Sequence, residues 1–440
     1  MASKLENRPP ATSGGSPVGR DGLAAVAQGP QDPFEVRWLA RRKWALLVAA
    51  SFCVTGIAFT FWWAPVVQHV PQWAYSGDLW DTYRAAQWVS WGNEGSVYQH
   101  GIYAIFFPGI EVLLAPVAMV ATHYRLVNPY PYFVPKPTVL PILLPYVLAI
   151  SVPALFVFDS SAEFLGVGRS RRILVCWMQG VLLWPVVVLW GHPEEALALS
   201  FAVLAIMASF KGKWGRAGWL LGFAIAFQPY ALLLLPMLLG LTPKGHRLVT
   251  IGRSLLLSCT LLVLPLVQGW HATTHDLLLQ PTYLRPNNAT PLLALAPHLA
   301  RGMYSAGVGR YLVALCALAA GWWAWRHRPG PLEIFWLAGL VFAVRFAVEP
   351  VVTPYYVWAS AVFLLPVSGC HGRRRFVLTA CAIAFASLWA YHRASPWEYW
   401  LPIVVILGLA VALARPDVET VGPAPPVMEP VAGPSGSPLP

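Results

Sequence analysis

Long apolar stretches separated by short polar ones run through most of the 440-residue chain. A helix needs roughly 17–25 apolar residues to cross the hydrocarbon core of a bilayer. The pattern therefore predicts an all-α polytopic membrane protein with roughly 10–12 transmembrane helices. The apolar segments lie near 44–66, 102–122, 139–158, 173–190, 195–210, 217–241, 249–268, 311–325, 331–348, 353–369, 376–391 and 398–414.

Composition agrees with this pattern, since 57% of the residues are hydrophobic and only 11% are charged. Soluble domains carry about 25% charged residues. The net charge is +11, but the basic residues form short clusters between apolar segments, such as "RSRR", "KGKWGR" and "GRRR". Such clusters mark cytoplasmic loops. We therefore expect the partner to be the lipid bilayer and not a nucleic acid.

Prolines interrupt two of the apolar segments, and a proline inside a helix removes a backbone hydrogen bond. If 102–122 is a re-entrant hairpin broken at Pro108 and Pro116, and 217–241 is two half-helices broken at "FQPY", every basic cluster faces the cytoplasm. Broken helices are tolerated in a membrane where protein or a wet cavity satisfies the backbone. The outer face then carries loops at about 67–101, 191–195, 227–231, 269–310 and 348–355.

Both ends of the chain are rich in Pro, Gly, Ser and Ala, so residues 1–34 and 416–440 are predicted to be disordered cytoplasmic tails. Residues 35–415 form the predicted multi-pass domain. Its first apolar run is too long for the hydrophobic part of a secretory signal, which favours a retained anchor. No nucleotide-binding glycine motif or metal-ligand cysteine spacing occurs, so we expect no cofactor and no metal.

Acidic residues are rare in this chain, and two of them open the first outer loop. Asp78 and Asp81 are three residues apart, and Arg84 is three further on. An ion pair on one helix face, or a helix cap at Asp78, is the simple structural explanation. Aromatic residues surround the pair, including Trp80 and Tyr83. Such rings suit either the membrane interface or a sugar-binding surface.

A second polar group lies in "GHPEEA", at the predicted start of a helix. Glu194 and Glu195 complement the positive end of the helix dipole. Together with His192 they exceed what a cap needs. A His/Glu/Glu metal site is the alternative, although the second histidine expected at i+4 is missing.

A third group lies near the outer end of an apolar helix, where Arg345 and Glu349 are spaced i, i+4. An intrahelical ion pair is one explanation. An ionisable residue inside a span is also a functional hypothesis, and the planar arginine fork suits a phosphate. Neighbouring outer loops offer further polar groups, namely Gln228, Arg285, Asn287 and Asn288.

Taken together, these segments resemble a known family. "GDLWDTYRAA…WGNEGSVY" resembles the opening motif of the membrane-embedded GT-C glycosyltransferases and is closest to glycosyltransferase family 87, the actinobacterial polyprenol-phosphate mannosyltransferase type. Later segments resemble that family in order: "FFPGIEVLLAPVAMV", "AGWLLGFAIAFQPYALLLLPMLL", "LRPNNATPL" and "EPVVTPYYVWASAVFLLP". The resemblance covers roughly residues 44 to 370.

The chain departs from that family pattern at three places. Asp78 and Tyr83 are five residues apart where the family has four, and Asp81 competes for the same role. The family lysine before proline is Gln228. The late family histidine is replaced by tyrosine, at Tyr355 or Tyr356. These differences bear on donor identity and on activity.

The resemblance implies a GT-C-like helical bundle in the plasma membrane with both termini in the cytoplasm. It implies transfer of a sugar, mannose being favoured, from a polyprenyl-phosphate donor to a hydroxyl of a glycan or glycolipid. Asp78 or Asp81 would be the general base, and Arg345, Arg285 and His192 would bind the donor phosphate. Substrate contacts would come from Tyr83, Trp80, Glu194, Glu195, Gln228, Asn287, Asn288, Glu349, Tyr355 and Tyr356.

Two other classes of protein fit the same pattern. Transporters or flippases of lipid-linked or polar solutes also place polar residues at helix breaks. A GT-C-like scaffold without catalytic activity is the second alternative. Acidic residues gathered at one face favour the transferase. Internal two-fold symmetry would favour the transporter, and a narrow cavity near Asp78 would favour the scaffold.

Overall fold

The computed structural model describes residues 40–67, 69, 72–99, 107–127, 136–283, 289–299, 303–305, 307–392 and 395–417. The chain divides into two units, Met1–Lys43 and Trp44–Pro440. The tail predicted at 1–34 and all but the start of the tail predicted at 416–440 lie outside the described residues.

Helices make up nearly all of the described structure. They are α2 (Lys43–Ala58), α3 (Ala64–Val67), α4 (Gly77–Ser90), α5 (Ser96–Gln99), α6 (Gly109–His123), α7 (Leu140–Ser151), α8 (Pro153–Phe164), α9 (Arg169–Trp184), α10 (Pro193–Phe210), α11 (Trp214–Phe227), α12 (Leu235–Leu241), α13 (Arg247–Leu279), α14 (Gly309–His327), α15 (Pro331–Val348), α16 (Tyr356–Gly369), α17 (Arg373–Trp389) and α18 (Pro396–Ala414). Shorter 3₁₀ or π turns are Phe59–Trp63, Pro185–Leu189, Pro229–Leu234, Lys244–His246 and Pro291–Leu295. Strands β1 (Thr282–Tyr283) and β2 (Met303–Tyr304) form one antiparallel pair.

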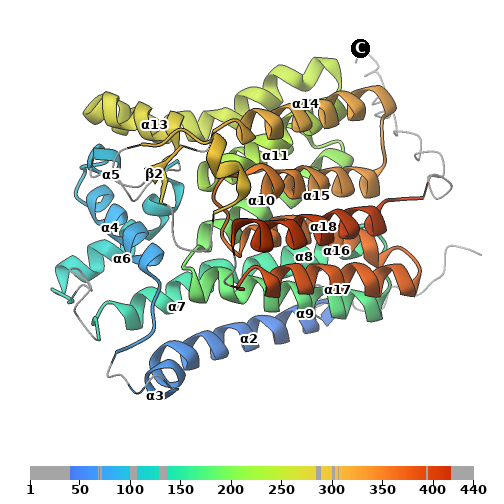
Figure 1. The fold of residues 1–440 in the computed structure, drawn as a ribbon. Coiled ribbons are helices and arrows are strands. Elements are labelled where there is room, and N and C mark those ends of the chain that lie inside the picture. Colours follow the sequence, from blue (N-terminus) through green and yellow to red (C-terminus); the bar gives the residue numbers. More distant parts are fainter. Residues whose placement is uncertain are drawn as a thin grey trace, which may run out of the picture. The chain divides into compact units, whose positions relative to one another are not determined.

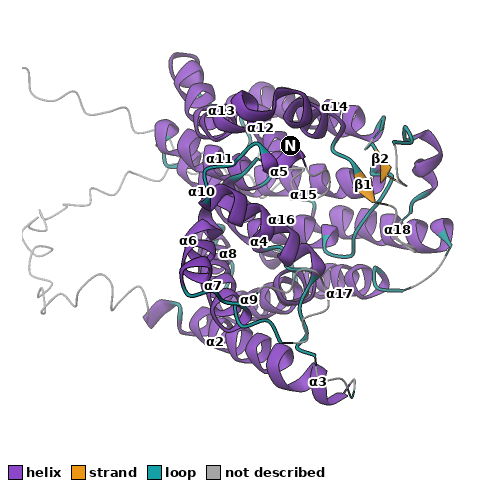
Figure 2. Ribbon diagram, turned by 90° about the vertical axis from the view of Figure 1, so that its left-hand side faces the viewer, coloured by secondary structure: helices purple, strands orange, loops and turns teal. Residues whose placement is uncertain are grey.

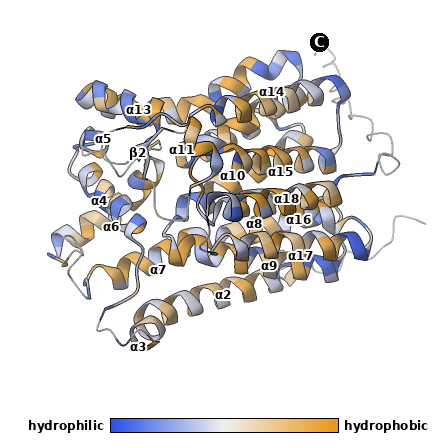
Figure 3. Ribbon diagram, viewed as in Figure 1, coloured by the Kyte–Doolittle hydropathy of each residue, from blue (hydrophilic) through white to orange (hydrophobic). Residues whose placement is uncertain are grey.

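Seven helices of the described chain are long and apolar enough to cross a membrane: Lys43–Val67, Leu140–Phe164, Arg169–Leu189, Pro193–Phe210, Lys244–Leu279, Pro331–Val348 and Pro396–Ala414. Three shorter apolar helices are Gly109–His123, Pro229–Leu241 and Tyr356–Gly369. Hydrophobic residues fill the long helices, and hydrophilic residues gather towards their ends (Figure 3). The protein is therefore an all-α polytopic membrane protein, as the sequence predicts. With the three shorter apolar helices, ten apolar helices of the described residues stand beside the roughly 10–12 transmembrane helices expected.

Within Trp44–Pro440 the long helices run side by side (Figure 1), with α10 packed on α11, α15 on α16 and α17 on α18. Large buried side chains such as Phe158, Phe335, Phe342 and Trp358 fill the spaces between them. Helix α4 packs on α6, and α5 packs on α13, at one end of the long helices. Figure 2 views the molecule from that end.

One predicted helix break is confirmed. Helix α11 ends at Phe227, and Gln228 has extended backbone angles (φ −145°, ψ 118°). A 3₁₀ turn then leads into α12. The break brings the polar Gln228 side chain to a helix end inside the protein, where it is 2% exposed.

Two backbone predictions are wrong. Helix α6 continues through Pro116, so no hairpin break occurs there; the Tyr146 hydroxyl donates to the Leu113 carbonyl (2.9 Å), near the disturbed turn. Residues 270–279, expected in a loop, extend α13 beyond a kink at Gly269. The Thr273 hydroxyl donates across that kink to the Pro265 carbonyl (3.0 Å), which stabilises the helical continuation.

Helices α12 and α14 approach closely through two glycines. A Cβ at Gly321 would lie 2.5 Å from the Pro236 carbonyl carbon, and a Cβ at Gly240 would lie 2.4 Å from the Gly321 oxygen. Gly321→Ala is expected to lower the melting temperature in detergent, although alanine is the better helix former, because overpacking costs about 1–3 kcal/mol. Gly408→Ala is the control, since nothing lies within 4 Å of that site. Equal melting temperatures for the two variants would contradict the close approach.

Candidate functional site

The polar residues singled out from the sequence meet where several helices begin or end. Helix α4 starts after Ser76, whose hydroxyl accepts from the Asp78 N–H (3.1 Å) and donates to the Trp190 carbonyl (2.6 Å). This pair of hydrogen bonds ties the start of α4 to the segment that precedes α10. Two regions of the chain, 114 residues apart, are thereby joined.

Gly191 makes this approach possible. Its φ is +73°, in the left-handed region that disfavours side chains, and a Cβ there would lie 2.6 Å from Leu79 Cβ. Both the turn and the contact with α4 therefore require glycine. The residue that follows, His192, is carried directly to the start of α4.

His192 lies between two carboxylates. Its Nε2 is 3.3 Å from Asp78 Oδ2, and its Nδ1 is 2.5 Å from Glu194 Oε1. The Tyr355 ring lies against the imidazole, with ring centroids 4.5 Å apart. Glu194 is 1% exposed, whereas the side chain of Asp78 is 21% exposed. Asp78 is thus the accessible end of an Asp78–His192–Glu194 row.

Arg345 organises a second group of side chains. Its guanidinium lies over the rings of Tyr230 (4.3 Å) and Tyr356 (4.6 Å), and its Nε is 3.5 Å from Glu349. The Tyr230 hydroxyl donates to the buried carboxylate of Glu195. Contacts with two aromatic faces and a carboxylate fix the orientation of the guanidinium.

The two groups are adjacent. Glu194 and Glu195 are neighbours at the start of α10, and the rings of Tyr355 and Tyr356 meet edge to face at 5.0 Å. The carboxylate of Asp78 and the guanidinium of Arg345 are therefore linked through a short path of packed side chains.

A cavity of about 240 Å³ lies beside Arg345. It opens at the helix break, and its polar lining consists of Gln228, Tyr230, Gln280, Arg310, Arg345 and Glu349. The structure thus brings Gln228, Arg345 and Glu349 together, as the sequence suggested. Arg310 and Gln280 were missed. Arg310 flanks an apolar segment, where a basic residue usually reports topology, and Gln280 lies in the stretch expected to be a loop.

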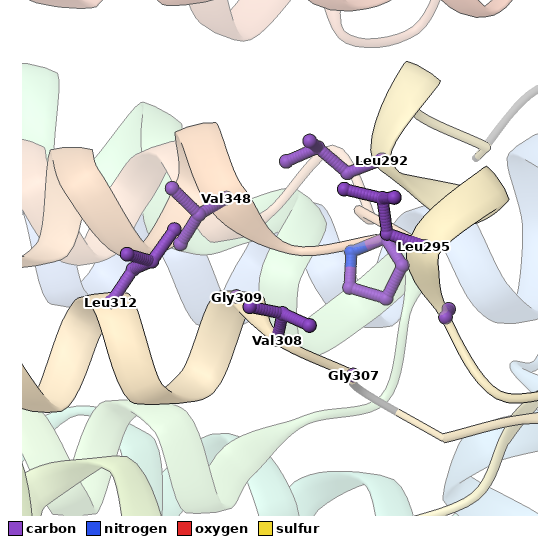
Figure 4. Close-up of a pocket in the computed structure, with 9 residues that line it drawn as sticks. Leu292, Leu295, Gly307, Val308, Gly309, Leu312 and Val348 are labelled. Atoms are coloured by element: carbon purple, nitrogen blue, oxygen red, sulfur yellow. The ribbon is translucent and has the colours of Figure 1, made fainter.

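A small apolar pocket is lined by residues that neighbour those of the cavity in the chain (Figure 4). Leu292 and Leu295 of the Pro291–Leu295 turn face Leu312 of α14 and Val348 of α15. Gly309 and Val348, which line it, directly precede Arg310 and Glu349 in the chain. Residues of the polar cavity and of the apolar pocket therefore alternate along the start of α14 and the end of α15.

Other predicted site residues lie elsewhere. Trp80 and Tyr83 are buried in the hydrophobic core, where their rings pack edge to face at 5.8 Å, so their position is that of packing groups. Asp81 is half-buried, one turn beyond Asp78 on α4. His192 was expected at the donor phosphate, but both its ring nitrogens face carboxylates. Outside the described residues lie Arg285, Asn287 and Asn288.

Burial also singles out an acid that the sequence reasoning did not use. Glu111 on α6 is 1% exposed, and its Oε2 has no hydrogen-bond partner among the described residues. Among those residues, no group of three or more His, Cys, Asp and Glu side chains could hold a metal ion.

No family model matches the sequence, and comparison with curated proteins gives no significant match. The fold and the site define a polytopic membrane protein with a partly buried carboxylate and an arginine-lined cavity at one set of helix ends. Any functional assignment therefore depends on this geometry and on the resemblance of the motifs.

Proposed function

We propose that the protein is a membrane glycosyltransferase of the GT-C type. It transfers a sugar, mannose being favoured, from a polyprenyl-phosphate donor to a hydroxyl of a cell-envelope glycan or glycolipid. The observation that carries the proposal is the path of contacts that links Asp78 to the cavity: Asp78 faces His192, the rings of Tyr355 and Tyr356 follow, and Tyr356 packs on Arg345, which lines the cavity. A base and an anion site are the two functions that such a transfer requires.

Asp78 acts as the general base. Its carboxylate takes the proton of the acceptor hydroxyl while the acceptor oxygen attacks the anomeric carbon. The bond between that carbon and the phosphate oxygen breaks, and the phosphate leaves with the electron pair. The leaving group is already a stable anion, so it needs positive charge rather than an acid. Arg345 supplies that charge.

The cavity suits an amphiphilic donor. Arg345 and Arg310 line the polar part, and planar guanidinium groups bind phosphate oxygens well. The lipid tail would begin on the apolar surface formed by Leu292, Leu295 and Leu312. Glu349 keeps the Arg345 side chain oriented along the cavity wall.

The departures from the family pattern are compatible with activity. Tyr355, one of the two tyrosines at the late histidine position, packs against His192. An imidazole from a different part of the chain therefore stands beside that position. Gln228, which replaces the family lysine, lines the same cavity as Arg310, so a cation is present there from another helix.

The proposed orientation puts both termini in the cytoplasm and the site at the outer face of the plasma membrane. Its support is the clustering of basic loops. Arg171 donates to the carbonyls of Gly369 and His371, and Arg328 donates to the Leu241 carbonyl (3.2 Å). These contacts bring basic residues of one loop to the end of a helix from another part of the chain, and the positive-inside rule assigns such basic ends to the cytoplasm.

The proposal is tested by sugar transfer from radiolabelled polyprenyl-phosphate mannose to endogenous lipids. Membranes that contain the protein are compared with membranes from cells carrying the empty vector, and we expect label in glycolipid only in the former. An arabinose donor is the second substrate. Absence of transfer from both donors would contradict the proposal, and solute movement in proteoliposomes would then favour the transporter.

A further inference from the structure

We propose that Glu194 is a positioning residue that fixes His192, which in turn holds the carboxylate of Asp78 at the site of transfer. The inference rests on the proposed function and adds to it a residue that never touches substrate. It assigns His192 to the base rather than to the donor phosphate.

The ring geometry supports this assignment. The two nitrogens of an imidazole lie on different edges of a rigid plane, so a contact at one of them orients the other. Glu194 Oε1 is 2.5 Å from Nδ1, and Asp78 Oδ2 is 3.3 Å from Nε2. The Nδ1 contact with Glu194 is a hydrogen bond, whereas Nε2 faces Asp78 at ion-pair distance. When the imidazole is protonated, its positive charge therefore lies between the two carboxylates.

Glu194 is itself held rigidly. It follows Pro193 in the first turn of α10, where proline fixes the backbone and the helix dipole favours a carboxylate. The side chain is 1% exposed, and His192 is its hydrogen-bonding side-chain partner among the described residues. This buried carboxylate therefore fixes the orientation of the His192 ring.

Groups from three other elements surround this pair. Asp78 comes from α4, the Tyr355 ring covers the imidazole from the segment before α16, and Glu111 of α6 is close enough to Glu194 to interact electrostatically. Glu195, the neighbour of Glu194, also interacts with His192. The negative surroundings favour the charged imidazole over the neutral one.

This environment changes the protonation of His192. Burial alone would lower the pKa of His192, but the carboxylates of Glu194 and Asp78 raise it from 6.5 to about 10. Because the folded-state pKa is the higher one, protonation stabilises the folded protein. That contribution is complete below about pH 6.5 and is lost as the pH rises to about 10.

The first test compares sugar transfer by wild type, Glu194→Gln and Glu194→Ala. Glutamine keeps an oxygen that accepts from Nδ1 but loses the charge. We therefore expect activity to decrease from wild type to Glu194→Gln and further to Glu194→Ala. Losses of about 10–100-fold in kcat are expected, the range seen when the outer hydrogen-bond partner of a metal-bound histidine is removed. The KM for the donor stays unchanged. In Glu194→Gln the alkaline fall in activity moves to lower pH.

Glu333→Gln is the matched control, because Glu333 caps the opposite end of α15 and lies outside the site. We expect it to retain wild-type activity and pH profile. If Glu194→Gln and Glu194→Ala match wild type while Asp78→Asn is inactive, the positioning role is wrong and the transferase proposal stands.

The second test does not depend on activity. Melting temperatures of wild type, His192→Gln, Glu194→Gln and the double variant are measured in detergent from pH 6 to pH 10. The difference between wild type and His192→Gln should shrink as the pH rises, and Glu194→Gln should abolish most of that pH dependence. These four proteins form a double-mutant cycle that needs no sugar transfer. If the effects of the two substitutions on the melting temperature simply add, Glu194 does not act through His192 and the inference is overturned.

Discussion

Asp78→Asn is expected to lower the rate of sugar transfer by about 10²–10⁴-fold, the range over which a general base accelerates a reaction. Asparagine keeps the size of the side chain and its contact with His192, but it cannot take the proton of the acceptor hydroxyl. The loss should appear in kcat, with donor binding retained. The measurement is transfer from radiolabelled polyprenyl-phosphate mannose by membranes with matched protein levels.

Asp81→Asn is the matched control for this substitution. It makes the same chemical change one turn further along α4, and Asp78 is the aspartate that the structure places beside His192. We expect Asp81→Asn to retain activity within a few-fold of wild type. If Asp81→Asn alone loses activity, the base is Asp81, and if neither variant loses activity, both carboxylates are structural.

The fold class was predictable because the membrane constrains the sequence so strongly. A backbone that crosses a bilayer must satisfy its own hydrogen bonds, so it forms apolar helices long enough to span the membrane, and these can be recognised in the sequence. The break at Gln228 was predictable for the same reason, since "FQPY" places a proline and a polar side chain inside an apolar run. Pro116 misled because α6 accommodates it without a break, and the hydroxyl of Tyr146, from another helix, bonds to the Leu113 carbonyl in the same turn.

The candidate site was predictable only in its parts. Asp78, Glu194 and Arg345 stand out because charges are rare in apolar surroundings. Their partners do not follow from spacing. His192 meets Asp78 because Gly191 turns against Leu79 and Ser76 bonds to Trp190, and these contacts join regions far apart in the chain. Arg310 was missed because a basic residue beside an apolar segment looks the same whether it marks topology or lines a cavity.

Arg345→Lys is expected to lower kcat/KM for the donor by about 10²–10³-fold, the cost of removing one group that stabilises a developing anion. Lysine keeps the charge, so the loss tests the shape of the group rather than its sign. The guanidinium is held as a plane over Tyr230 and Tyr356 and against Glu349. An ammonium group cannot reproduce that stacking or bind two phosphate oxygens at once.

Arg326→Lys is the control, because Arg326 is exposed in the last turn of α14, away from the cavity. The concentrations of donor and acceptor are varied separately, because loss of a phosphate contact should change the kinetic constants for the donor. A loss confined to the acceptor KM would place Arg345 at the acceptor instead. If Arg345→Lys matches wild type while Arg310→Lys does not, the phosphate is held from α14, and the stacked arginine serves to keep the helix ends of α15 and α16 together.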